Sequence, residues 1–436
     1  MDYLVKIRSV QTPLNGQFSI GANKPGPEDY FSRDFYEQCE FYRFHDVLGI
    51  SMEQFEKWLE GDEVKQEEPP KIKLEDKKVE TSATLVSALA SKPFVILAGT
   101  TGTGKTKTIR DLAAKINPVV SEPYFNHAFI PVEAGWTDGR HLLGYKNPFG
   151  RSGENYVSTK LIDTLLKANY PDYANIPFFI ILDEMNLSHV EMYFSKFLSV
   201  METSKDKNPE PVLGLEELYL LYKSGVTDPV QTTYILNAIN KNGLFITDNV
   251  FFIGTVNMDE TTYMFSPKVL DRSFVIQYSP PKPSTVGSEF SLLNADILEA
   301  TTEKFSTFMT SSSNVGLDNK YDDYLDTLYD AMGKFRFGPR TTNEVRRYIA
   351  VCSKIASAPK DFKFPNDFCD QASILDRVTV QKILPKIHGN RDTLVPVFKN
   401  LKELFEKEKL IISNEKLEQM RKDVMNTGFV NYFSTV

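Results

Sequence analysis

Residues 99–106 read GTTGTGKT and directly follow an apolar run at 94–98. The apolar run predicts a buried strand, and the glycines predict a tight loop that leads from this strand into a helix. In such a loop, successive backbone N–H groups point inward, where an anionic phosphate can lie against them. We therefore expect a P-loop that binds a nucleotide through Gly99, Thr100, Thr101, Gly102, Thr103, Gly104, Lys105 and Thr106.

The end of this motif predicts how the phosphates are held. Lys105 supplies a positive charge for the outer phosphates, and Thr106 supplies a hydroxyl ligand for Mg²⁺. The helix expected over 106–116 directs its positive dipole end at the same anion. A chance match in a Gly/Thr-rich surface turn is the alternative, and the flanking strand and helix argue against it.

A second apolar run, at 176–182, ends in Asp183 and Glu184. A run of this length bounded by acids predicts a strand buried on both faces of a parallel sheet, with the acids at its carboxyl end. Many strands end in acidic turns, but together with a P-loop this pattern indicates a Walker B motif. Asp183 is then expected to hold Mg²⁺, and Glu184 to orient and polarise the water that attacks the terminal phosphorus.

A third strand is predicted at 250–256 and ends at Asn257. An uncharged amide at a strand end beside the γ-phosphate fixes an attacking water without adding charge, so Asn257 is the sensor-1 candidate. Asp259 and Glu260 follow it, and either cap the next turn or take part in catalysis.

Two arginines are candidates for contacting phosphates from outside the P-loop. Arg272 lies just before another apolar run, where ring NTPases place a guanidinium that neutralises charge on the neighbouring subunit's nucleotide. A salt bridge with Asp271 or Glu260 is the alternative. Arg340 begins a predicted helix and is the sensor-2 candidate, with a surface arginine as the alternative and Arg336 as a competitor.

In this order, the motifs resemble those of McrB-type AAA+ motor subunits of modification-dependent restriction systems. The segment at 136–148, WTDGRHLLGYKNP, also resembles the sequence that these proteins carry between their Walker motifs. The resemblance covers about residues 85–401 and rests on GTTGTGKT, ILDEMNLSHVEMYFSKFLSVME, GTVNMDETTYMFSPKVLDRSF and QKILPKIHG.

The resemblance implies an α/β fold with an AAA+ P-loop NTPase core, in which helices sandwich a parallel sheet, and an all-helical lid lobe. It also implies a ring-forming, usually hexameric NTPase that powers or regulates a McrC-like nuclease subunit on DNA. The founding McrB enzymes prefer GTP and carry Asn-Thr-Ala-Asp-Arg at sensor 1, whereas this chain has Asn-Met-Asp-Glu-Thr at 257–261. The nucleotide is therefore expected to be GTP or ATP.

Composition shifts predict the domain organisation. A small, aromatic-rich amino-terminal domain at 1–61, a possible recognition or interaction module, precedes a charged linker at 62–80. The motor domain is expected at 81–280 and the helical lid at 281–436, after a proline-rich break. Lid helices are predicted at 295–308, 321–335, 342–355, 371–384 and 394–410.

The overall composition constrains partners and compartment. The chain has 436 residues, a net charge of −8 and 41% hydrophobic residues, which predicts a soluble protein without the basic character of a dedicated duplex binder. Contact with DNA is then local or made by a partner. Cys39, Cys352 and Cys369 are too far apart in sequence for a zinc motif. We find no signal sequence or membrane-length apolar run, so a cytoplasmic location is expected.

Three segments allow more than one interpretation. Trp136 and its cationic neighbours either contact a partner, which is slightly favoured, or pack on the sheet. A helix is predicted at 190–201, and the insertion that follows it, with helical pieces at 215–222 and 233–239, is either a pore or partner element or a solvated excursion. A basic cluster consists of Lys382, Lys386, His388 and Arg391. It either lies on a solvated helix face, which is favoured, or contacts a nucleic acid or a subunit.

Two functions remain open. In the first, the chain is a ring NTPase that drives a partner nuclease in restriction or anti-phage defence. In the second, it is a nucleotide-gated scaffold or switch with little turnover of its own. The presence of Glu184, Asn257 and Arg272 favours the first, because a switch does not need a complete hydrolytic set.

Overall fold

The computed structural model describes residues 74–433, apart from gaps at 118, 120–121, 123, 151–152, 225–227, 259–262, 279–306, 312–314, 358–363 and 366. The expected amino-terminal domain at 1–61 and most of the first expected lid helix lie outside the described residues. Positions 74–80, expected in the linker, instead belong to helix α5 (Leu74–Ser91). Within the described part, none of the helices has the length and apolar character that a bilayer crossing requires.

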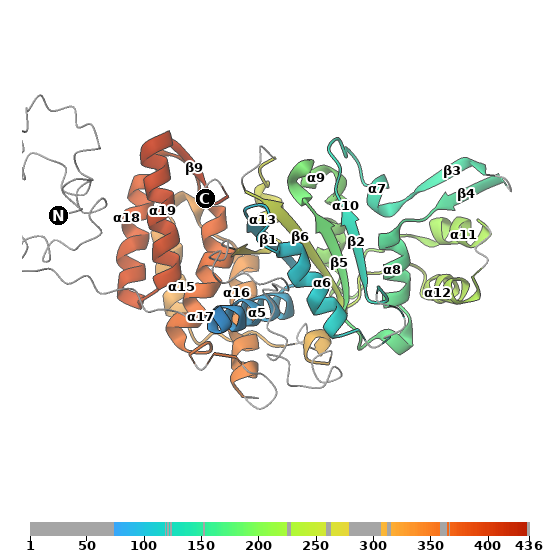
Figure 1. Cartoon of the computed structure of the whole chain (residues 1–436), viewed down its shortest axis with the longest axis horizontal. Coiled ribbons are helices and arrows are strands. Elements are labelled where there is room, and N and C mark those ends of the chain that lie inside the picture. The colour runs from blue at the N-terminus through green and yellow to red at the C-terminus, as the bar shows by residue number, and fades with distance from the viewer. Residues whose placement is uncertain are drawn as a thin grey trace, which may run out of the picture. The chain divides into compact units, whose positions relative to one another are not determined.

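A five-stranded parallel sheet forms the core, in the order β2-β5-β6-β1-β7 (Figure 1). In that order the strands are His127–Pro131, Phe178–Asp183, Val250–Asn257, Phe94–Gly99 and Phe274–Tyr278. The side chains of β1 and β6 are all buried, as expected for strands covered on both faces. The strands predicted from the apolar runs are confirmed, whereas β2 carried no clear sequence signal.

The register of the sheet brings the ends of the motif-bearing strands together. β6 lies between β1 and β5, with Gly99 paired to Asn257 and Leu182 paired to Gly254. Because these strands are parallel, the P-loop, the two acids after β5 and Asn257 all lie at the carboxyl edge of the sheet. Open parallel sheets bind ligands at this edge.

Helices flank the sheet (Figure 1). Helix α6 follows the P-loop and packs against β1 and β5, and α8 packs against β2 and β5. The remaining connections contain the short helices α7 and α13. The bounds of these helices are Lys105–Lys115 for α6, Arg140–Leu143 for α7, Lys160–Ala168 for α8 and Pro267–Leu270 for α13.

The helix predicted at 190–201 is interrupted at Phe194. This residue separates α9 (Val190–Tyr193) from α10 (Ser195–Thr203). Its ring lies 5.5 Å from that of Phe94 on β1 and 5.6 Å from that of Phe252 on β6, between ring centroids. The helix is thus broken at Phe194, whose ring packs on the sheet, and the apolar periodicity of the sequence did not predict this break.

A β-hairpin and two helices form a further region beside β2. Helices α11 (Leu215–Lys223) and α12 (Pro229–Asn240) confirm the helical pieces predicted in the insertion. The hairpin of β3 (Tyr145–Gly150) and β4 (Gly153–Val157) was not predicted. Strand β4 packs against α11, and Figure 1 shows all four elements gathered at the same side of the sheet.

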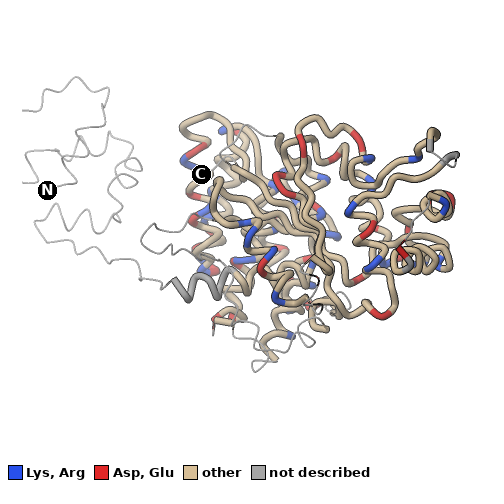
Figure 2. Tube along the Cα trace, turned by 45° about the vertical axis from the view of Figure 1, so that its right-hand side comes forward, with Lys and Arg blue, Asp and Glu red and all other residues tan. Residues whose placement is uncertain are grey.

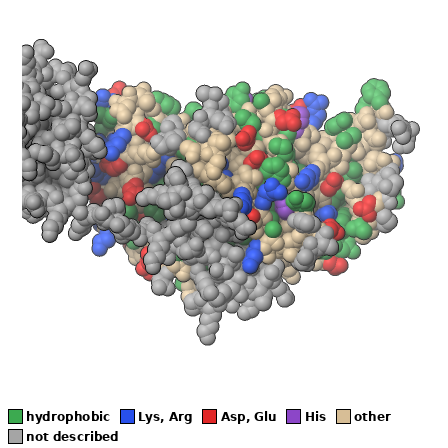
Figure 3. Space-filling model, viewed as in Figure 1, with side chains coloured by type: hydrophobic (Ala, Val, Ile, Leu, Met, Phe, Trp, Pro, Cys, Tyr) green, Lys and Arg blue, Asp and Glu red, His purple; other side chains and the backbone are tan. Residues whose placement is uncertain are grey.

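Several large apolar side chains of this region are exposed. Phe149 on β3 is 91% exposed, and Tyr219 and Tyr222 on α11 are about half exposed. Hydrophobic atoms are visible at the surface in this part of Figure 3. Isolated apolar side chains are common on protein surfaces, so they do not decide between a partner-docking element and a solvated excursion.

The chain after β7 is mainly helical. The predicted helix at 371–384 is α-helical only to Val378 and continues as a π-helix to Ile383. The last long helix, α19, was not predicted. The helices of this region are α15 (Asp322–Ala331), α16 (Pro339–Ala356), α17 (Gln371–Val378), α18 (Arg391–Glu408) and α19 (Ile411–Thr427). A small antiparallel pair joins β8 (His388–Asn390) to β9 (Phe429–Asn431).

A buried ionic cluster ties this helical region to the sheet. Glu344 on α16 lies 2.5 Å from the Lys382 ammonium and 2.6 Å from that of Lys92, which precedes β1. Lys382 is fully buried, and burial lowers its pKa to about 8 while Glu344 opposes that shift. Lys386 is also largely buried and pairs with Asp271. The expectation of a solvated basic face is therefore wrong for both lysines.

Replacing Lys382 by methionine should lower the free energy of unfolding by about 3 kcal/mol, because Glu344 would stay buried with one cation fewer. Urea denaturation measures the change. The control is Lys407→Met, since Lys407 is 73% exposed and 3.7 Å from the carboxylate of Glu408; this change should have little effect. Equal losses in the two variants would contradict the importance of the buried cluster.

Candidate functional site

The loop between β1 and α6 has the backbone that its glycines predict. Gly102 and Gly104 have φ values of 79° and 85°, in the left-handed region that glycine adopts most readily. Gly99 is required for another reason, because a Cβ there would lie 2.5 Å from the carbonyl oxygen of Tyr278. The glycines therefore allow both the turn and a close approach to β7.

Lys105 lies inside this loop and is only 5% exposed. Its ammonium donates hydrogen bonds to the carbonyl oxygens of Gly99 and Thr100, at 2.9 and 2.8 Å. Helix α6 begins at Lys105, with Gly104 as its N-cap and no acidic residue in its first turn. The lysine charge and the helix dipole thus both favour an anion at this place.

A continuous set of hydrogen bonds joins the P-loop helix to the acids at the end of β5. The Thr106 hydroxyl donates to Asp183 Oδ1 at 2.6 Å, and the Thr255 hydroxyl donates to the same oxygen at 2.7 Å. Thr255 in turn accepts a bond from the backbone N–H of Glu184 at 3.0 Å. The Asn257 amide donates to Glu184 Oε1 at 2.9 Å. The structure therefore brings together the predicted residues Thr106, Asp183, Glu184 and Asn257.

Glu184 has an unusual backbone for a residue with a side chain. Its φ and ψ of 53° and 47° are left-handed, which typically costs about 1–3 kcal/mol and is concentrated at functional sites. The bonds to Thr255 and Asn257 hold both its backbone and its carboxylate in place. This left-handed backbone turns the chain at the end of β5, and the Glu184 carboxylate lies beside Asn257 at the edge of the sheet.

Thr255 is a member of the site that sequence reasoning missed. It is 2% exposed and lies two residues before Asn257 on β6, so both side chains project to the same face of the sheet. Threonine is common in strands, and its position in an apolar run therefore gave no distinct signal. Only the hydrogen bonds between Thr255 and the end of β5 show that its hydroxyl orients the two acids.

The donor set at this edge fits a magnesium ion bound together with phosphates. Thr106 and Asp183 place a hydroxyl and a carboxylate oxygen 2.6 Å apart, and Mg²⁺ prefers such oxygen ligands in nucleotide sites. Among the described residues, there is no cluster of at least three His, Cys, Asp or Glu side chains arranged for a metal. An ion here would accordingly complete its coordination with phosphate and water.

Arg272 and Arg340 lie together, away from this edge. Arg272 comes two residues before Phe274, which pairs with Val95 near the start of β1, so it lies at the amino edge of the sheet. Its guanidinium bonds to the carboxylate of Glu202, and that of Arg340 lies 2.5 Å from the same Glu202 oxygen. The partner of Arg272 is thus Glu202, whereas the sequence suggested Asp271 or Glu260 for a salt bridge.

Other candidate residues are placed differently from the expectation. Trp136 is only 8% exposed and packs within the chain, with its ring centroid 4.7 Å from that of His141 and 5.5 Å from that of Tyr193. Arg140 and Tyr145 of the same segment are exposed, and the contact with a partner stays a prediction. The competitor Arg336 pairs with Asp330 at 3.2 Å. Asp259 and Glu260 lie outside the described residues.

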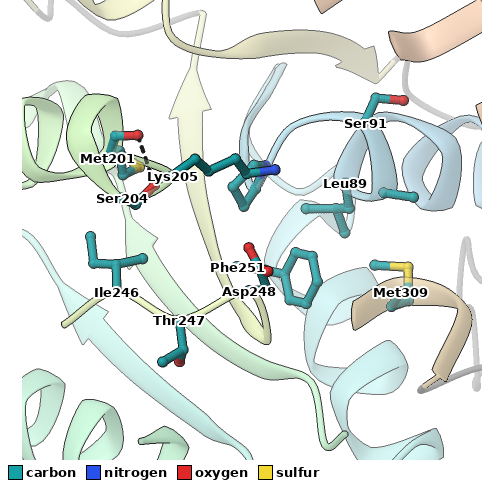
Figure 4. A pocket seen from close by; sticks show the side chains of 12 residues that line it. Leu89, Ser91, Met201, Ser204, Lys205, Ile246, Thr247, Asp248, Phe251 and Met309 are labelled. Carbon is teal, nitrogen blue, oxygen red and sulfur yellow. Dashed lines mark hydrogen bonds between the residues drawn. The ribbon is translucent and has the colours of Figure 1, made fainter. Parts of the chain in front are cut away.

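A small cavity lies at the opposite, amino edge of the sheet (Figure 4). Its volume is about 20 Å³, which is enough for roughly one water molecule and far too small for a nucleotide. Met201, near the end of α10, and Lys205 both line this cavity. Burial lowers the pKa of Lys205 to about 8. The P-loop edge is consequently the better candidate for nucleotide binding.

Comparison with known proteins adds one match. The model of a family described as a domain of unknown function (DUF8727) matches residues 296–429, which include helices α15 to α19. No curated protein matches the chain. The matched part is a minority of the chain and does not contain the P-loop or the acids after β5.

Replacing Thr255 by valine should weaken the Mg²⁺ dependence of nucleotide binding, with about a 10–100-fold higher Mg²⁺ requirement. The change keeps the side-chain shape but removes the donor to Asp183 and the acceptor for the Glu184 N–H. Titration of Mg²⁺ against a fluorescent nucleotide analogue measures the effect.

Thr164→Val is the matched control for this experiment. Thr164 is also buried and donates to the Lys160 carbonyl within α8, at 2.8 Å, away from the acids. Its Mg²⁺ requirement should equal that of the unaltered protein. An unchanged requirement in Thr255→Val would remove Thr255 from the site.

Proposed function

We propose that the chain is a P-loop NTPase of the AAA+ class that hydrolyses GTP or ATP with Mg²⁺. The observation that carries this proposal is the hydrogen-bonded set at the carboxyl edge of the sheet. In this set, Thr106 bonds to Asp183 and Asn257 bonds to Glu184. Thr255 connects the two pairs, because it bonds to Asp183 and to the backbone N–H of Glu184. A nucleotide-binding loop alone would not require an acid and an amide fixed against each other at its edge.

The residues support a division of tasks in hydrolysis. The P-loop amides and Lys105 would bind the phosphates, and Thr106 with Asp183 would hold the magnesium ion, whose charge stabilises the phosphates. Glu184 would accept a proton from the attacking water, and the Asn257 amide would orient that carboxylate and the water. The partly buried position of these groups favours fixed orientation over free rotation.

The positions of the arginines support an oligomer. Arg272 lies at the edge opposite to the P-loop of its own chain, so its guanidinium is suited to a nucleotide bound by another copy. A head-to-tail contact that repeats in this way closes into a ring when the rotation permits. We propose a ring, hexameric by resemblance, in which each junction combines the P-loop of one subunit with Arg272 of the next.

The proposed cellular role rests on the resemblance to McrB-type motors. In that role the ring drives or regulates a McrC-like nuclease on DNA in the cytoplasm, for restriction or anti-phage defence, and the helices after β7 form its lid. Acidic and basic positions are interspersed along the described trace in Figure 2. This distribution favours DNA contact through a partner or a local site over a broad basic surface.

A nucleotide-gated switch with little turnover is the second candidate. It is favoured by one observation, namely that both Arg272 and Arg340 are engaged by Glu202 within the same chain. In such a switch, Glu202 would hold these two arginines until a partner or a neighbouring subunit binds, and that partner would stimulate turnover. Phosphate release measured with and without the protein encoded beside this chain separates the two, and competition between ATP and GTP identifies the base.

The Glu184→Gln variant should bind nucleotide with unchanged affinity and lose turnover by about 100-fold or more, because the general base is removed while the phosphate contacts remain. Binding is measured with a fluorescent nucleotide analogue, and turnover by phosphate release. Glu216→Gln, at a carboxylate that is 73% exposed on α11, serves as the control. Normal hydrolysis by Glu184→Gln would rule out this role.

Action of Arg272 across a junction is tested by mixing two inactive variants. Arg272→Ala retains Glu184, and Glu184→Gln retains Arg272, so about one quarter of the junctions in an equal random mixture would combine both intact residues. We expect turnover to reappear in the mixture. If Arg272 served the nucleotide of its own chain, the mixture would remain as inactive as its components.

A further inference from the structure

One carboxylate binds both arginines at the amino edge of the sheet. Glu202 Oε1 accepts from the Arg272 guanidinium and lies 2.5 Å from an Arg340 nitrogen. Glu202 belongs to α10, Arg340 to α16, and Arg272 to the turn between α13 and β7. Three segments that are distant in sequence therefore meet at a single oxygen atom.

The helices involved do not favour these charges for their own stability. Glu202 occupies the last turn of α10, and Arg340 is the second residue of α16. A carboxylate near a helix C-terminus and a cation near a helix N-terminus both oppose the helix dipole. The ion pairs of Glu202 with Arg340 and Arg272 compensate these unfavourable charges. The positions of Glu202 and Arg340 are therefore explained by their contact with each other and not by the stability of their own helices.

The backbone around Arg272 is held independently of its side chain. The buried Lys382 ammonium donates to the carbonyl oxygens of Asp271 and Ser273, at 2.8 and 2.9 Å. The Arg272 guanidinium also donates to the carbonyl oxygen of Lys268 at 2.7 Å. With the backbone fixed on both sides of Arg272, the direction of its guanidinium depends mainly on Glu202 and this carbonyl group.

The cluster keeps a positive charge and remains accessible. Two guanidinium groups share one carboxylate, and the side-chain exposure is 15% for Arg272, 31% for Glu202 and 48% for Arg340. Without the carboxylate, the two cations would repel each other. The carboxylate thus allows both cations to stand at the same surface, where they can meet an anion with several charges.

We infer that Glu202 is a positioning residue that holds Arg272 and Arg340 as a pair, so that both guanidiniums are presented to the triphosphate bound by a neighbouring subunit. This inference rests on the proposed function and extends it, because it assigns Arg340 to the junction with Arg272 and gives Glu202 a role. Arg340 then acts on the neighbour's nucleotide and not on that of its own chain.

The first test compares Glu202→Gln with the unaltered full-length protein. The variant should lose turnover by about 100-fold, because a small misplacement of a group that contacts the transition state has an effect of this size. The affinity for a fluorescent nucleotide analogue should stay within about twofold, since the P-loop is untouched. Glu202→Asp, which keeps the charge on a shorter side chain, should recover part of the turnover.

Glu210→Gln is the matched control. Glu210 is 40% exposed and lies 2.5 Å from Lys196, another residue of α10, so this change removes a comparable ion pair from the same helix. Its turnover and its thermal unfolding temperature should equal those of the unaltered protein. A loss in Glu202→Gln alone then reports on the arginines and not on the stability of α10.

The second test asks whether Glu202 acts through the arginines. In a chain that already carries Arg272→Ala and Arg340→Ala, the residual turnover, followed as single-turnover phosphate release at high protein concentration, should not fall further when Glu202→Gln is added, because interactions that share one partner are not additive. A further loss would place the effect of Glu202 elsewhere and overturn the inference. Unchanged turnover in the single variant Glu202→Gln would overturn it as well.

The outcomes separate this inference from the proposed function. If the unaltered protein hydrolyses nucleotide and Glu202→Gln hydrolyses it equally well, only the role of Glu202 is lost. If the unaltered protein neither binds nor hydrolyses ATP or GTP, alone or with the protein encoded beside it, the proposed function fails and the inference fails with it. Turnover that falls in Glu202→Gln, with nucleotide binding preserved, supports both.

Discussion

The parallel pairing of β6 between β1 and β5 is the constraint on which the candidate site depends. It aligns Gly99 with Asn257 and sets the end of β5 beside them. Motifs separated by long stretches of sequence thereby meet at one edge of the sheet. Without that register, the glycine-rich loop after β1 would have no fixed acid or amide next to it.

The two edges of the sheet carry different charge arrangements. At the carboxyl edge, hydroxyl groups and an amide orient the acids, and Lys105 is held inside the loop by carbonyl oxygens. At the amino edge, lysines and arginines are held by Glu344 and Glu202. The first edge is suited to a nucleotide bound by the same chain. At the second edge Lys382 is buried, whereas Arg340 is about half exposed and Arg272 is partly exposed, which suits an anion brought by another molecule.

Much of the core and most of the site could be predicted, because apolar runs and turn residues are local signals. The strands ending at Gly99, Asp183 and Asn257 follow from such patterns. Contacts between distant segments carry no local signal. Thr255 looked like an ordinary strand residue, Trp136 looked like a surface aromatic, and the sequence around Lys382 indicated a solvated helix. Thr255 and Lys382 were decided by Asp183 and Glu344, which are far away in the chain, and Trp136 packs against both the nearby His141 and the distant Tyr193.

The sequence by itself determined where the glycine-rich loop between β1 and α6 lies, which glycines it needs and which polar residues end the buried strands. These properties depend on backbone conformation and hydrophobic periodicity, which act over a few residues. The tertiary structure alone decided that Thr255 joins the two acids and that Glu202 gathers Arg272 with Arg340. Hydrogen bonds and ion pairs of this kind depend on the register of strands and the docking of helices, which only the folded chain defines.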